Sequence, residues 1–452
     1  MAREQRHGHA TAQPNVPGRG IVAGYGWRFW LIVAALGFVT GIGSGGLLKL
    51  LDLLERALWG GSHLTLVRSI EQTSSLHRVL VLLAGGLLAG LGALILRRIK
   101  GGVEVSEALW LADGRMRLIP TLARAVDSIV AVAFGASLGL EAGPQQVGAS
   151  FASAVSDWAG LPAWQRRLLV ACGAGSGLAA VYNMPLGGAL FALEVMLGTL
   201  ALPLVLPALV MTVTASASAW IIIGNRATYF TPRFAVHPSQ IVWALIVGPI
   251  AGLVGVLWIR TIAAAHAVRP TGAAAQFALP VAMFLLLGVV SIAYPQVLGN
   301  GKSMVQYGVI GAFSLGTFAV LLLLKPAMTA GTLATGVPGG LFTPTLAIGT
   351  MLGGLAGGLW LHVWPGGDVG SFALIGGAAL LGAAMQGPLS AVVMVLELMP
   401  RAAGLTVPIL IAVATGTIVA RVAGVHSIYA VRLARRWSDE GRPETTNDVI
   451  PA

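Results

Sequence analysis

One carboxylate stands alone in an apolar, glycine-rich stretch of the chain. Glu141 lies in the segment GLEAGPQQVG, residues 139–148, where every neighbour is small, apolar or an uncharged amide. An ionisable side chain in a membrane segment indicates a functional site by default. Such a carboxylate can occupy the place of an anion and leave it by moving or by taking up a proton. The alternative is a structural carboxylate that caps a neighbouring helix.

The same segment has the composition of a helix start, and a second segment matches it. GLFTPTLAIG, residues 340–349, lies about 200 residues further along and also places glycine before a proline in an apolar run. Proline in the first turn and glycine just before it are typical helix-start signals. Two opposed helix starts would present backbone N–H groups and positive dipole ends to one point. The pair therefore predicts an anion site built from backbone groups near the middle of a membrane.

A second pair of matching segments lies downstream of the first. Residues 183–197 read NMPLGGALFALEVML and residues 386–400 read QGPLSAVVMVLELMP. In both, Pro-Leu precedes an apolar helical run that ends in Leu-Glu-x-Met. Two matches at nearly the same spacing indicate a duplicated half of about 200 residues. Glu194 and Glu397 hold equivalent places, which indicates a shared structural task, capping or pairing with arginine, rather than proton transfer.

The elements that position these residues are membrane helices. Of 452 residues, 56% are hydrophobic and 10% are charged, against about 25% charged in soluble domains. A helix needs about 20 apolar residues to span the hydrocarbon core. The stretches that reach or approach this length are Phe29–Leu47, Val79–Leu96, Ala201–Ile223, Val242–Ile259, Phe277–Tyr294 and Leu405–Ala420. The 61 glycines and 23 prolines favour close helix packing and broken or re-entrant helices around an enclosed cavity.

The net charge of +11 is concentrated outside the apolar stretches. Basic residues in both tails, such as Arg6 and Arg435, place both termini in the cytoplasm and predict an even number of crossings. The tails lack the aromatic or repeated basic pattern that favours nucleic-acid binding, so no nucleic-acid partner is expected. The single cysteine, Cys172, excludes an internal disulfide bond. The polar, glycine-rich N-terminal stretch does not have the pattern of a cleavable signal peptide.

These segments resemble the CLC family of chloride channels and chloride/proton antiporters, and the resemblance covers almost the whole chain. GASLGLEAGP (135–144) is similar to the family's gating-glutamate motif, with Glu141 at the place of the gating glutamate. LGNG at Leu298–Gly301 is typical of the family's second half.

The second filter segment of the family is matched more fully. GVPGGLFTPTLAIG (336–349) resembles the Gly-x-Phe-x-Pro motif through Gly340, Phe342 and Pro344. Tyr429, in GVHSIYAVR, matches the tyrosine whose hydroxyl faces the central anion. On its pattern alone Tyr429 would instead be a tyrosine of the membrane-interface belt.

The first filter segment departs from the family pattern. The family's Gly-Ser-Gly-Ile-Pro falls on IKGGVEVSEAL, residues 99–109, where an alignment without gaps puts Lys100 in place of the filter serine. An ammonium there would bind the transported anion directly and leave the favoured anion open. The alternative is a snorkelling basic cluster with Arg97 and Arg98 at a helix end.

Three other positions bear on the mechanism. Leu140 replaces the basic residue of the gating motif. Val195 follows Glu194 where antiporters of the family carry a second glutamate, and valine there resembles the channel branch. Arg124 precedes the gating segment where the family often has a basic residue, as a long-range electrostatic element or as an interfacial anchor.

The resemblance implies an all-α polytopic membrane protein with a CLC-like fold of two inverted repeats and broken or re-entrant helices. Residues 28–430 would form the transport domain, with repeats at about 28–225 and 240–430. Residues 1–27 and 431–452 would be cytoplasmic tails, too short for the regulatory domains of some family members. The resemblance further implies a homodimer with one pore per subunit in a cytoplasmic membrane of bacterial type.

The resemblance also assigns the residues that handle the ion. Glu141 would be the gate. The anion-binding residues would be Lys100, Gly101, Gly340, Leu341, Phe342 and Tyr429, with Leu341 and Phe342 acting through their backbone N–H groups. These assignments imply passive, channel-type chloride transport gated by Glu141, with chloride/proton exchange as the alternative. Chloride or a similar small anion would be the transported ligand.

Other functional classes find little support. GASLG (135–139) fits the Gly-x-Ser-x-Gly pattern of a hydrolase nucleophile, but the eight histidines are scattered, without a helical pair or metal-ligand spacing. GNGKS (299–303) lacks the upstream glycine of a phosphate-binding loop. We therefore expect neither an enzyme nor a bound metal or cofactor.

Overall fold

The computed structural model describes residues 25–60 and 66–430, so the expected cytoplasmic tails lie almost wholly outside the described residues. The helices of the first half are α1 (Trp27–Trp59), α2 (Leu66–Glu71), α3 (Ser75–Ile99), α4 (Val105–Leu111), α5 (Leu118–Ala133), α6 (Ala142–Trp158), α7 (Ala163–Tyr182), α8 (Pro185–Leu190), a π-helical segment (Phe191–Met196) and α9 (Leu202–Ile223). Those of the second half are α10 (Pro238–Ala267), α11 (Ala273–Ala293), α12 (Lys302–Val309), α13 (Leu315–Ala334), α14 (Phe342–Trp360), α15 (Val369–Met385), α16 (Pro388–Leu398) and α17 (Thr406–Val422), with 3-10 turns at Pro295–Val297 and Pro400–Leu405.

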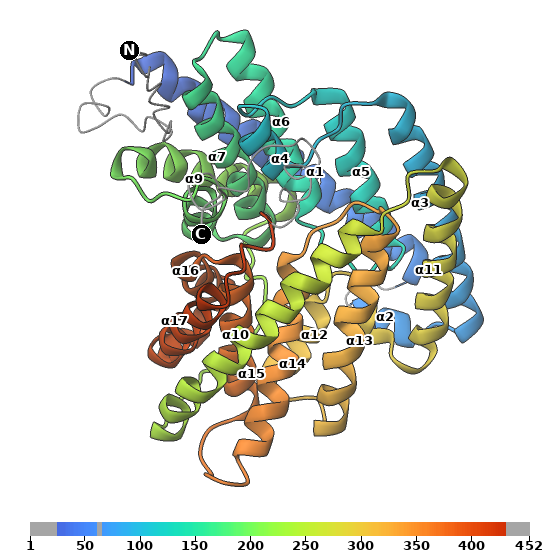
Figure 1. Ribbon diagram of the computed structural model, residues 1–452, viewed down its shortest axis with the longest axis vertical. Helices are drawn as coiled ribbons and strands as arrows, with labels where there is room; N and C mark the ends of the chain where they lie inside the picture. Colours follow the sequence, from blue (N-terminus) through green and yellow to red (C-terminus); the bar gives the residue numbers. More distant parts are fainter. Residues whose placement is uncertain (1–24, 61–65, 431–452) are drawn as a thin grey trace, which may run out of the picture.

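The second half repeats the first, element by element. The packed pairs α1 with α9, α6 with α7, and α5 with α6 recur as α10 with α17, α14 with α15, and α13 with α14. Figure 1 shows α6, α7 and α9 in the upper part of the view and α14 to α17 in the lower part, with α3 and α11 side by side where the halves meet. The expected all-helical architecture of two repeats is confirmed.

Eight helices of the described residues are long and apolar enough to cross a membrane. They contain all six apolar stretches expected from the sequence, apart from single residues at their ends. The two further spans are α13 and α14. In α14, 83% of the most apolar 18-residue window is buried inside the protein. Because α14 faces other helices rather than lipid, it tolerates threonine and glycine and escapes a search for the most apolar stretches.

Glycine allows the central helices of each half to touch at their backbones. A Cβ atom on Gly148 of α6 would lie 2.0 Å from the carbonyl oxygen of Gly173 in α7. The equivalent place in the second half is Gly349 of α14, where a Cβ would lie 2.7 Å from the carbonyl oxygen of Gly376 in α15. Such approaches exclude any side chain. The matching glycines in the two sequence repeats are therefore contact points of the same helix pair.

The proline-initiated helices begin in the same way in both halves. Asn183 follows the last residue of α7 with φ 55°, and Gln386 follows the last residue of α15 with φ 57°. Both φ values lie in the left-handed region that ends many helices. Pro185 and Pro388 then occupy the first position of α8 and α16, where the missing N–H has no helical partner to lose.

Glu194 and Glu397 cap each other's repeat. Glu397 accepts hydrogen bonds from the backbone N–H groups of Leu186 (3.1 Å) and Gly187 (2.6 Å) at the start of α8. Glu194 accepts the equivalent bonds from Leu389 (3.2 Å) and Ser390 (2.6 Å) at the start of α16. The shared structural task expected from their equivalent places is thus capping, and each carboxylate supplies it to the other half.

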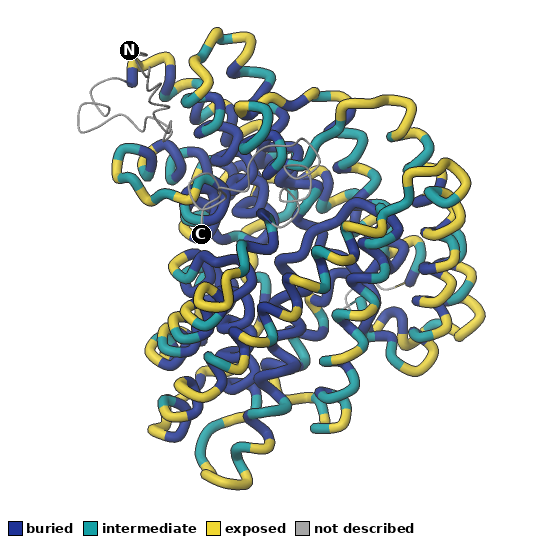
Figure 2. The backbone as a smooth tube through the Cα atoms, in the orientation of Figure 1, coloured by how far each residue is buried: buried dark blue, intermediate teal, exposed yellow. Residues whose placement is uncertain are grey.

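The core lies where the two halves meet. Figure 2 shows buried residues running through the middle of the molecule and exposed residues along α3 and α11 at its side. The buried face of α6, α7, α14 and α15 includes nearly every residue of α7 after Leu168 and nearly every residue of α15. This arrangement surrounds the two expected helix starts with protein on all sides.

Candidate functional site

The two helix starts are joined through their glycines. Gly139 N–H donates to the Gly340 carbonyl and Gly340 N–H donates to the Gly139 carbonyl, both at 2.8 Å. This two-residue antiparallel bridge sets the starts of α6 and α14 against each other, as expected for inverted repeats. Pro144 and Pro344 lie in the first turns of these helices, where the backbone N–H groups have no intrahelical partner.

Glu141 lies at this junction and is 1% exposed. Its Oε1 accepts a 2.6 Å hydrogen bond from the backbone N–H of Phe342 in the first turn of α14. Its Oε2 accepts a hydrogen bond from the hydroxyl of Tyr182 at 3.1 Å and a longer one from Thr343 at 3.4 Å. The carboxylate of one half therefore occupies the anion-binding helix start of the other half.

Both bridging glycines make room for this carboxylate. A Cβ atom on Gly139 would lie 2.1 Å from Glu141 Oε1, and one on Gly340 would lie 2.2 Å from the same atom. Neither position can hold a larger residue while Glu141 stays where it is. The conformation of Glu141 thus depends on glycine at two places about 200 residues apart in the chain.

A small cavity of about 40 Å³ adjoins the carboxylate. Since a water molecule needs about 10–15 Å³ of such space, the cavity has room for one small anion and little else. Its wall is formed by Glu104, Val105, Ser106, Arg124, Glu141, Ala142, Gln145, Gln146, Met196, Gly339, Gly340, Leu341 and Tyr429. We call this space the small cavity.

Apart from the Glu141 carboxylate itself, the charges beside the small cavity leave a positive balance. Arg124 lies 3.2 Å from Glu104, and Arg269 lies 3.6 Å from the same Glu104 oxygen. Two guanidinium groups therefore share one carboxylate. The sequence favoured a plain interfacial anchor for Arg124, with a long-range electrostatic role as the alternative; its place in the cavity wall favours the alternative. Such a wall favours an anion over a cation.

Two side-chain amides also face the small cavity. Gln145 and Gln146 in the first turns of α6 are 6% and 5% exposed. Within the described part of the chain, Gln145 Nε2 and Gln146 Oε1 have no hydrogen-bond partner. A buried donor without a partner is rare because its desolvation costs about 1–3 kcal/mol. The Gln145 amide is therefore suited to donate to an anion in the cavity.

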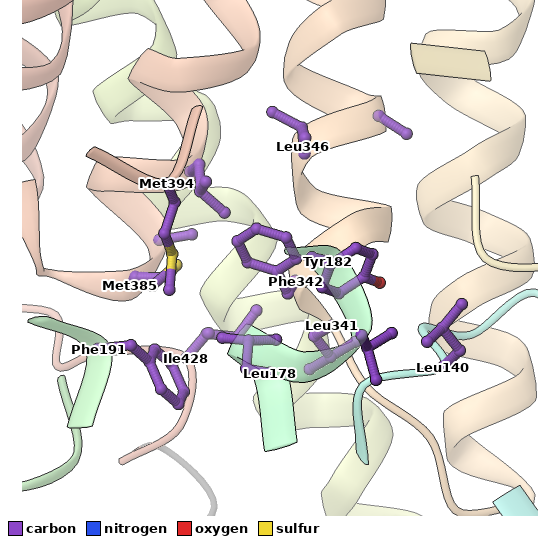
Figure 3. Packing of buried hydrophobic residues seen from close by; sticks show 14 of the residues in the cluster. Leu140, Leu178, Tyr182, Phe191, Leu341, Phe342, Leu346, Met385, Met394 and Ile428 are labelled. Atoms are coloured by element: carbon purple, nitrogen blue, oxygen red, sulfur yellow. The ribbon is translucent and has the colours of Figure 1, made fainter. Parts of the chain in front are cut away.

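Tyr429 reaches the small cavity from the C-terminal end of the described residues. Its side chain is half-buried and its ring packs edge-on against Phe191, with ring centroids 5.4 Å apart. Figure 3 shows Phe191 near Ile428 on the far side of the site from Leu140. The place of Tyr429 in the wall of the small cavity fits the anion-facing position that the resemblance implies and does not fit an interfacial belt.

Lys100 and Gly101 do not reach the site. Both are exposed and neither lines the small cavity. Lys100 ends α3 with φ 48°, and Gly101 follows with φ 88°. The cavity wall of this segment begins only at Glu104 and continues through Ser106. The alignment without gaps had placed Lys100 in the filter, but the geometry agrees with its alternative, a basic cluster at a helix end.

A wider space opens on another side of the carboxylate. This space, the large vestibule, has a volume of about 500 Å³, and its wall includes Leu140 and Tyr182. Leu140 precedes Glu141, and Tyr182 bonds to it. Glu141 thus lies between the small cavity and the large vestibule, with Tyr182 at the boundary.

The backbone before Glu141 is held by a buried lysine. Lys325 of α13 is fully buried, and its ammonium group donates to Ser137 Oγ (2.9 Å) and to the carbonyl oxygens of Val297 (3.1 Å) and Gly299 (2.8 Å). Three oxygens match the three donors of the ammonium group. Lys325 fixes the segment that leads into Glu141. The sequence analysis missed it, although a lysine inside an apolar run carries the same signal that singled out Glu141.

Tyr182, Thr343 and Gln145 were also missed by the sequence analysis. Tyr182 ends a helix and Thr343 follows the filter phenylalanine, so neither stands out by type. For Gln145 the available signal was its spacing from Glu141. It lies one helical turn after Glu141 and therefore on the same face. No comparable signal pointed to the contact between Tyr182 and Glu141.

The fold and the site together define a membrane protein in which opposed helix starts converge on a carboxylate and a cavity suited to an anion. The family model described as voltage gated chloride channel matches residues 85–421. A ClcB-like protein of Ralstonia nicotianae is 33% identical over 426 residues, covering 90% of this chain and 98% of that protein. A voltage-gated ClC-type chloride channel, ClcB, of Escherichia coli O9:H4 is 30% identical over 422 residues, covering 90% and 99%. The chain belongs to the CLC family, whose members transport or conduct anions.

Solved structures agree with this fold. A slow cyanobacterial Cl⁻/H⁺ antiporter superposes with a TM-score of 0.80 at 20% identity, covering 92% of this chain and all of the other. A CLC-type fluoride/proton antiporter superposes with a TM-score of 0.71 at 19% identity, covering 90% of this chain and 99% of the other. At these identities the similarity establishes the inverted-repeat architecture.

Proposed function

We propose that the protein conducts chloride passively across a membrane and that the Glu141 carboxylate is its gate. The observation that carries the proposal is the 2.6 Å hydrogen bond from the Phe342 N–H to Glu141 Oε1. A backbone N–H at a helix start is a donor suited to an anion. The carboxylate takes that place, so the pore is closed while the carboxylate stays and opens when it moves or is protonated.

In this proposal the anion is held by groups around the small cavity. Gly340, Leu341 and Tyr429 line it, the Gln145 amide adds a side-chain donor, and the Phe342 N–H is the donor that the carboxylate vacates. The positive balance of Arg124, Arg269 and Glu104 attracts the ion, while the Arg124 guanidinium stays paired with Glu104. Weak neutral donors suit conduction, since a site must also release its ion. Lys100 and Gly101 are left out because both are exposed away from the cavity.

Chloride/proton exchange is the second candidate, favoured by the similarity to solved Cl⁻/H⁺ and fluoride/proton antiporters. Against it stands Val195, which is 6% exposed and packs near Gly387. Valine cannot carry a proton, so exchange would need another side chain or a chain of water molecules. Glu194 is not that group in our proposal, since its two carboxylate oxygens are engaged in capping α16.

The expected setting is a homodimer in a cytoplasmic membrane, with one pore in each subunit and both termini in the cytoplasm. The orientation rests on the basic residues of the two tails. Exposed apolar side chains on α9, α16 and α17, such as Leu206, Leu389 and Ile418, face lipid or a second subunit. Mass determination in detergent and cysteine labelling from either side of the membrane test these two points.

The first experiment is chloride efflux from proteoliposomes with the pH recorded on both sides. For a channel, chloride moves without driving protons uphill. Flux should rise as the pH falls, and Glu141→Gln should make it independent of pH. If a chloride gradient drives protons uphill, exchange replaces conduction as the function. If Glu141→Gln keeps the wild-type pH dependence, Glu141 is not the gate.

A further inference from the structure

Two hydroxyl groups bond to the second carboxylate oxygen of Glu141. Oε1 of Glu141 is bound by the Phe342 N–H, whereas Oε2 faces the hydroxyls of Tyr182 and Thr343. These two hydroxyls are also hydrogen-bonded to each other. Three oxygens from α7, from α14 and from the segment before α6 thus form one cluster in which every member contacts the other two.

The cluster is rigid before any ion arrives. Tyr182 is 2% exposed and Thr343 is fully buried. The Tyr182 carbonyl accepts a 2.7 Å hydrogen bond from Thr228 Oγ1, and the Tyr182 ring packs against the Phe342 ring with centroids 5.5 Å apart. Figure 3 shows the two rings side by side, next to Leu341. The hydroxyls therefore need no rearrangement to meet the carboxylate.

The direction of the hydrogen bonds favours the ionised carboxylate. Tyr182 and Thr343 have one donor hydrogen each, so two of the three contacts can be hydrogen bonds while the carboxylate is ionised, with Thr343 donating to Tyr182 and Tyr182 donating to Glu141 Oε2. Hydrogen bonds to a charged acceptor are about twice as strong as neutral ones. A proton on Oε2 would remove the charge that strengthens the Tyr182 bond. The hydroxyls therefore oppose protonation of Glu141.

We propose that the hydroxyls of Tyr182 and Thr343 form a latch that holds Glu141 in the closed position and sets the pH at which the gate opens. This inference rests on the proposed gating role of Glu141. The backbone bond from Phe342 is a general feature of a helix start, while the latch is a separate device that side-chain changes can remove. Tyr182 and Thr343 are positioning residues in this scheme, since the ion passes where the carboxylate was.

Other ionisable groups lie around the cluster, and their charges also act on the protonation of Glu141. On the side of the small cavity are Glu104 and Arg124, paired with each other, and Asp127 lies on α5 one turn beyond Arg124. Further groups are the buried phenol of Tyr229, Lys325 behind Ser137, and Asp52, Glu55 and Lys302 in the large vestibule. Among the described residues, only Tyr182 and Thr343 place a side-chain hydroxyl within hydrogen-bond distance of the Glu141 carboxylate.

The test measures chloride flux against pH in proteoliposomes with equal pH on both sides. Tyr182→Phe and Thr343→Val remove the hydroxyls and keep the shapes. Each loss destabilises the ionised, closed carboxylate, so the pH of half-maximal flux should rise. A hydrogen bond to a charged group corresponds to a shift of about one pH unit, and Tyr182→Phe should exceed Thr343→Val because its bond is shorter. Tyr229→Phe is the matched control, because it removes a buried phenol that does not bond to Glu141, and it should leave the midpoint unchanged.

Three outcomes separate the latch from the gate. If Glu141→Gln abolishes the pH dependence and Tyr182→Phe then adds nothing in that background, the latch acts through the gate as proposed. If Glu141→Gln abolishes the pH dependence but Tyr182→Phe and Thr343→Val keep the wild-type midpoint, the latch is refuted and the gate stands. If Glu141→Gln changes nothing, both fail. Should Tyr182→Phe not assemble in detergent, Thr343→Val decides the question by itself.

Discussion

Glu141 Oε1 lies 2.6 Å from the backbone nitrogen of Phe342, a residue 201 positions further along the chain. That separation is about the length of one repeat, so the carboxylate of the first half rests in the helix start of the second. In the proposed mechanism a transported anion and this carboxylate compete for the same donor. The pore then opens when the anion replaces the carboxylate at the Phe342 N–H.

Replacing Gly340 by alanine should open the pore. The new Cβ would lie 2.2 Å from Glu141 Oε1, so the flexible carboxylate has to leave its place. Overpacking of this kind costs about 1–3 kcal/mol, and we expect chloride efflux at neutral pH to increase about tenfold or more. The double variant Gly340→Ala, Glu141→Ala should conduct no faster than Glu141→Ala, because the clashing atoms are absent. Wild-type flux and pH dependence in Gly340→Ala would contradict the steric account.

Changes at Gln145 should alter anion affinity. Gln145→Leu keeps the bulk and removes a buried donor, so half-saturation of flux should need about tenfold more chloride. Gln145→Glu replaces that donor by an acceptor-only charge and should abolish chloride flux. The measurement is the chloride dependence of efflux together with calorimetric titration in detergent. An unchanged affinity in Gln145→Leu would show that the amide does not face the ion.

The reciprocal caps should matter for stability and not for proton movement. Glu397→Ala leaves two helix-start N–H groups without an acceptor, and Glu194→Ala leaves two N–H groups and the Ser390 hydroxyl. Each variant should lower the apparent unfolding temperature in detergent by about 5 °C, with the larger effect at Glu194. The pH profile of flux should stay that of the wild type. A loss of proton movement without a loss of stability would instead make these carboxylates proton carriers.

Lys100 and Arg124 should respond differently to neutralisation. Lys100→Gln should leave chloride flux within about twofold, because the ammonium group is exposed and screened by solvent. Arg124→Gln removes a charge from the wall of the small cavity and leaves Glu104 with Arg269 alone, so flux should fall by about tenfold. Both are compared in proteoliposomes at equal protein density. If Lys100→Gln lowered the flux more than Arg124→Gln, Lys100 would instead be part of the anion filter.

The sequence was informative where a local pattern has a local cause. Apolar length predicted six of the eight candidate spans of the described residues. Proline after glycine predicted the starts of α6, α14 and α16, and the matching Pro-Leu pair predicted the start of α8. The equal spacing of two motif pairs predicted the repeat, and with it the shared task of Glu194 and Glu397. What it left undecided was whether these glutamates cap a helix or pair with arginine. That each caps a helix of the other half was not predicted, because spacing along a chain does not say how two repeats face each other.

The first filter segment shows where local reasoning failed to place a residue. Lys100 follows two arginines and an apolar helix, and an alignment without gaps carried it into the pore. The chain in fact turns through left-handed conformations at Lys100 and Gly101 and reaches the cavity only at Glu104. The latch could not be predicted from the sequence, for another reason. Tyr182 and Thr343 lie 161 residues apart, and nothing in either residue's surroundings in the sequence indicates the other.

The paired hydrogen bonds between Gly139 and Gly340 have a consequence for synthesis in the cell. The first half enters the membrane before the second exists, and at that stage Gly139 has no bridge, Glu141 has no Phe342 to bind, and α8 has no Glu397 at its start. In the proposed mechanism, an unfinished chain therefore lacks both a complete anion site and the groups that hold the gate closed, because both depend on residues of the second half.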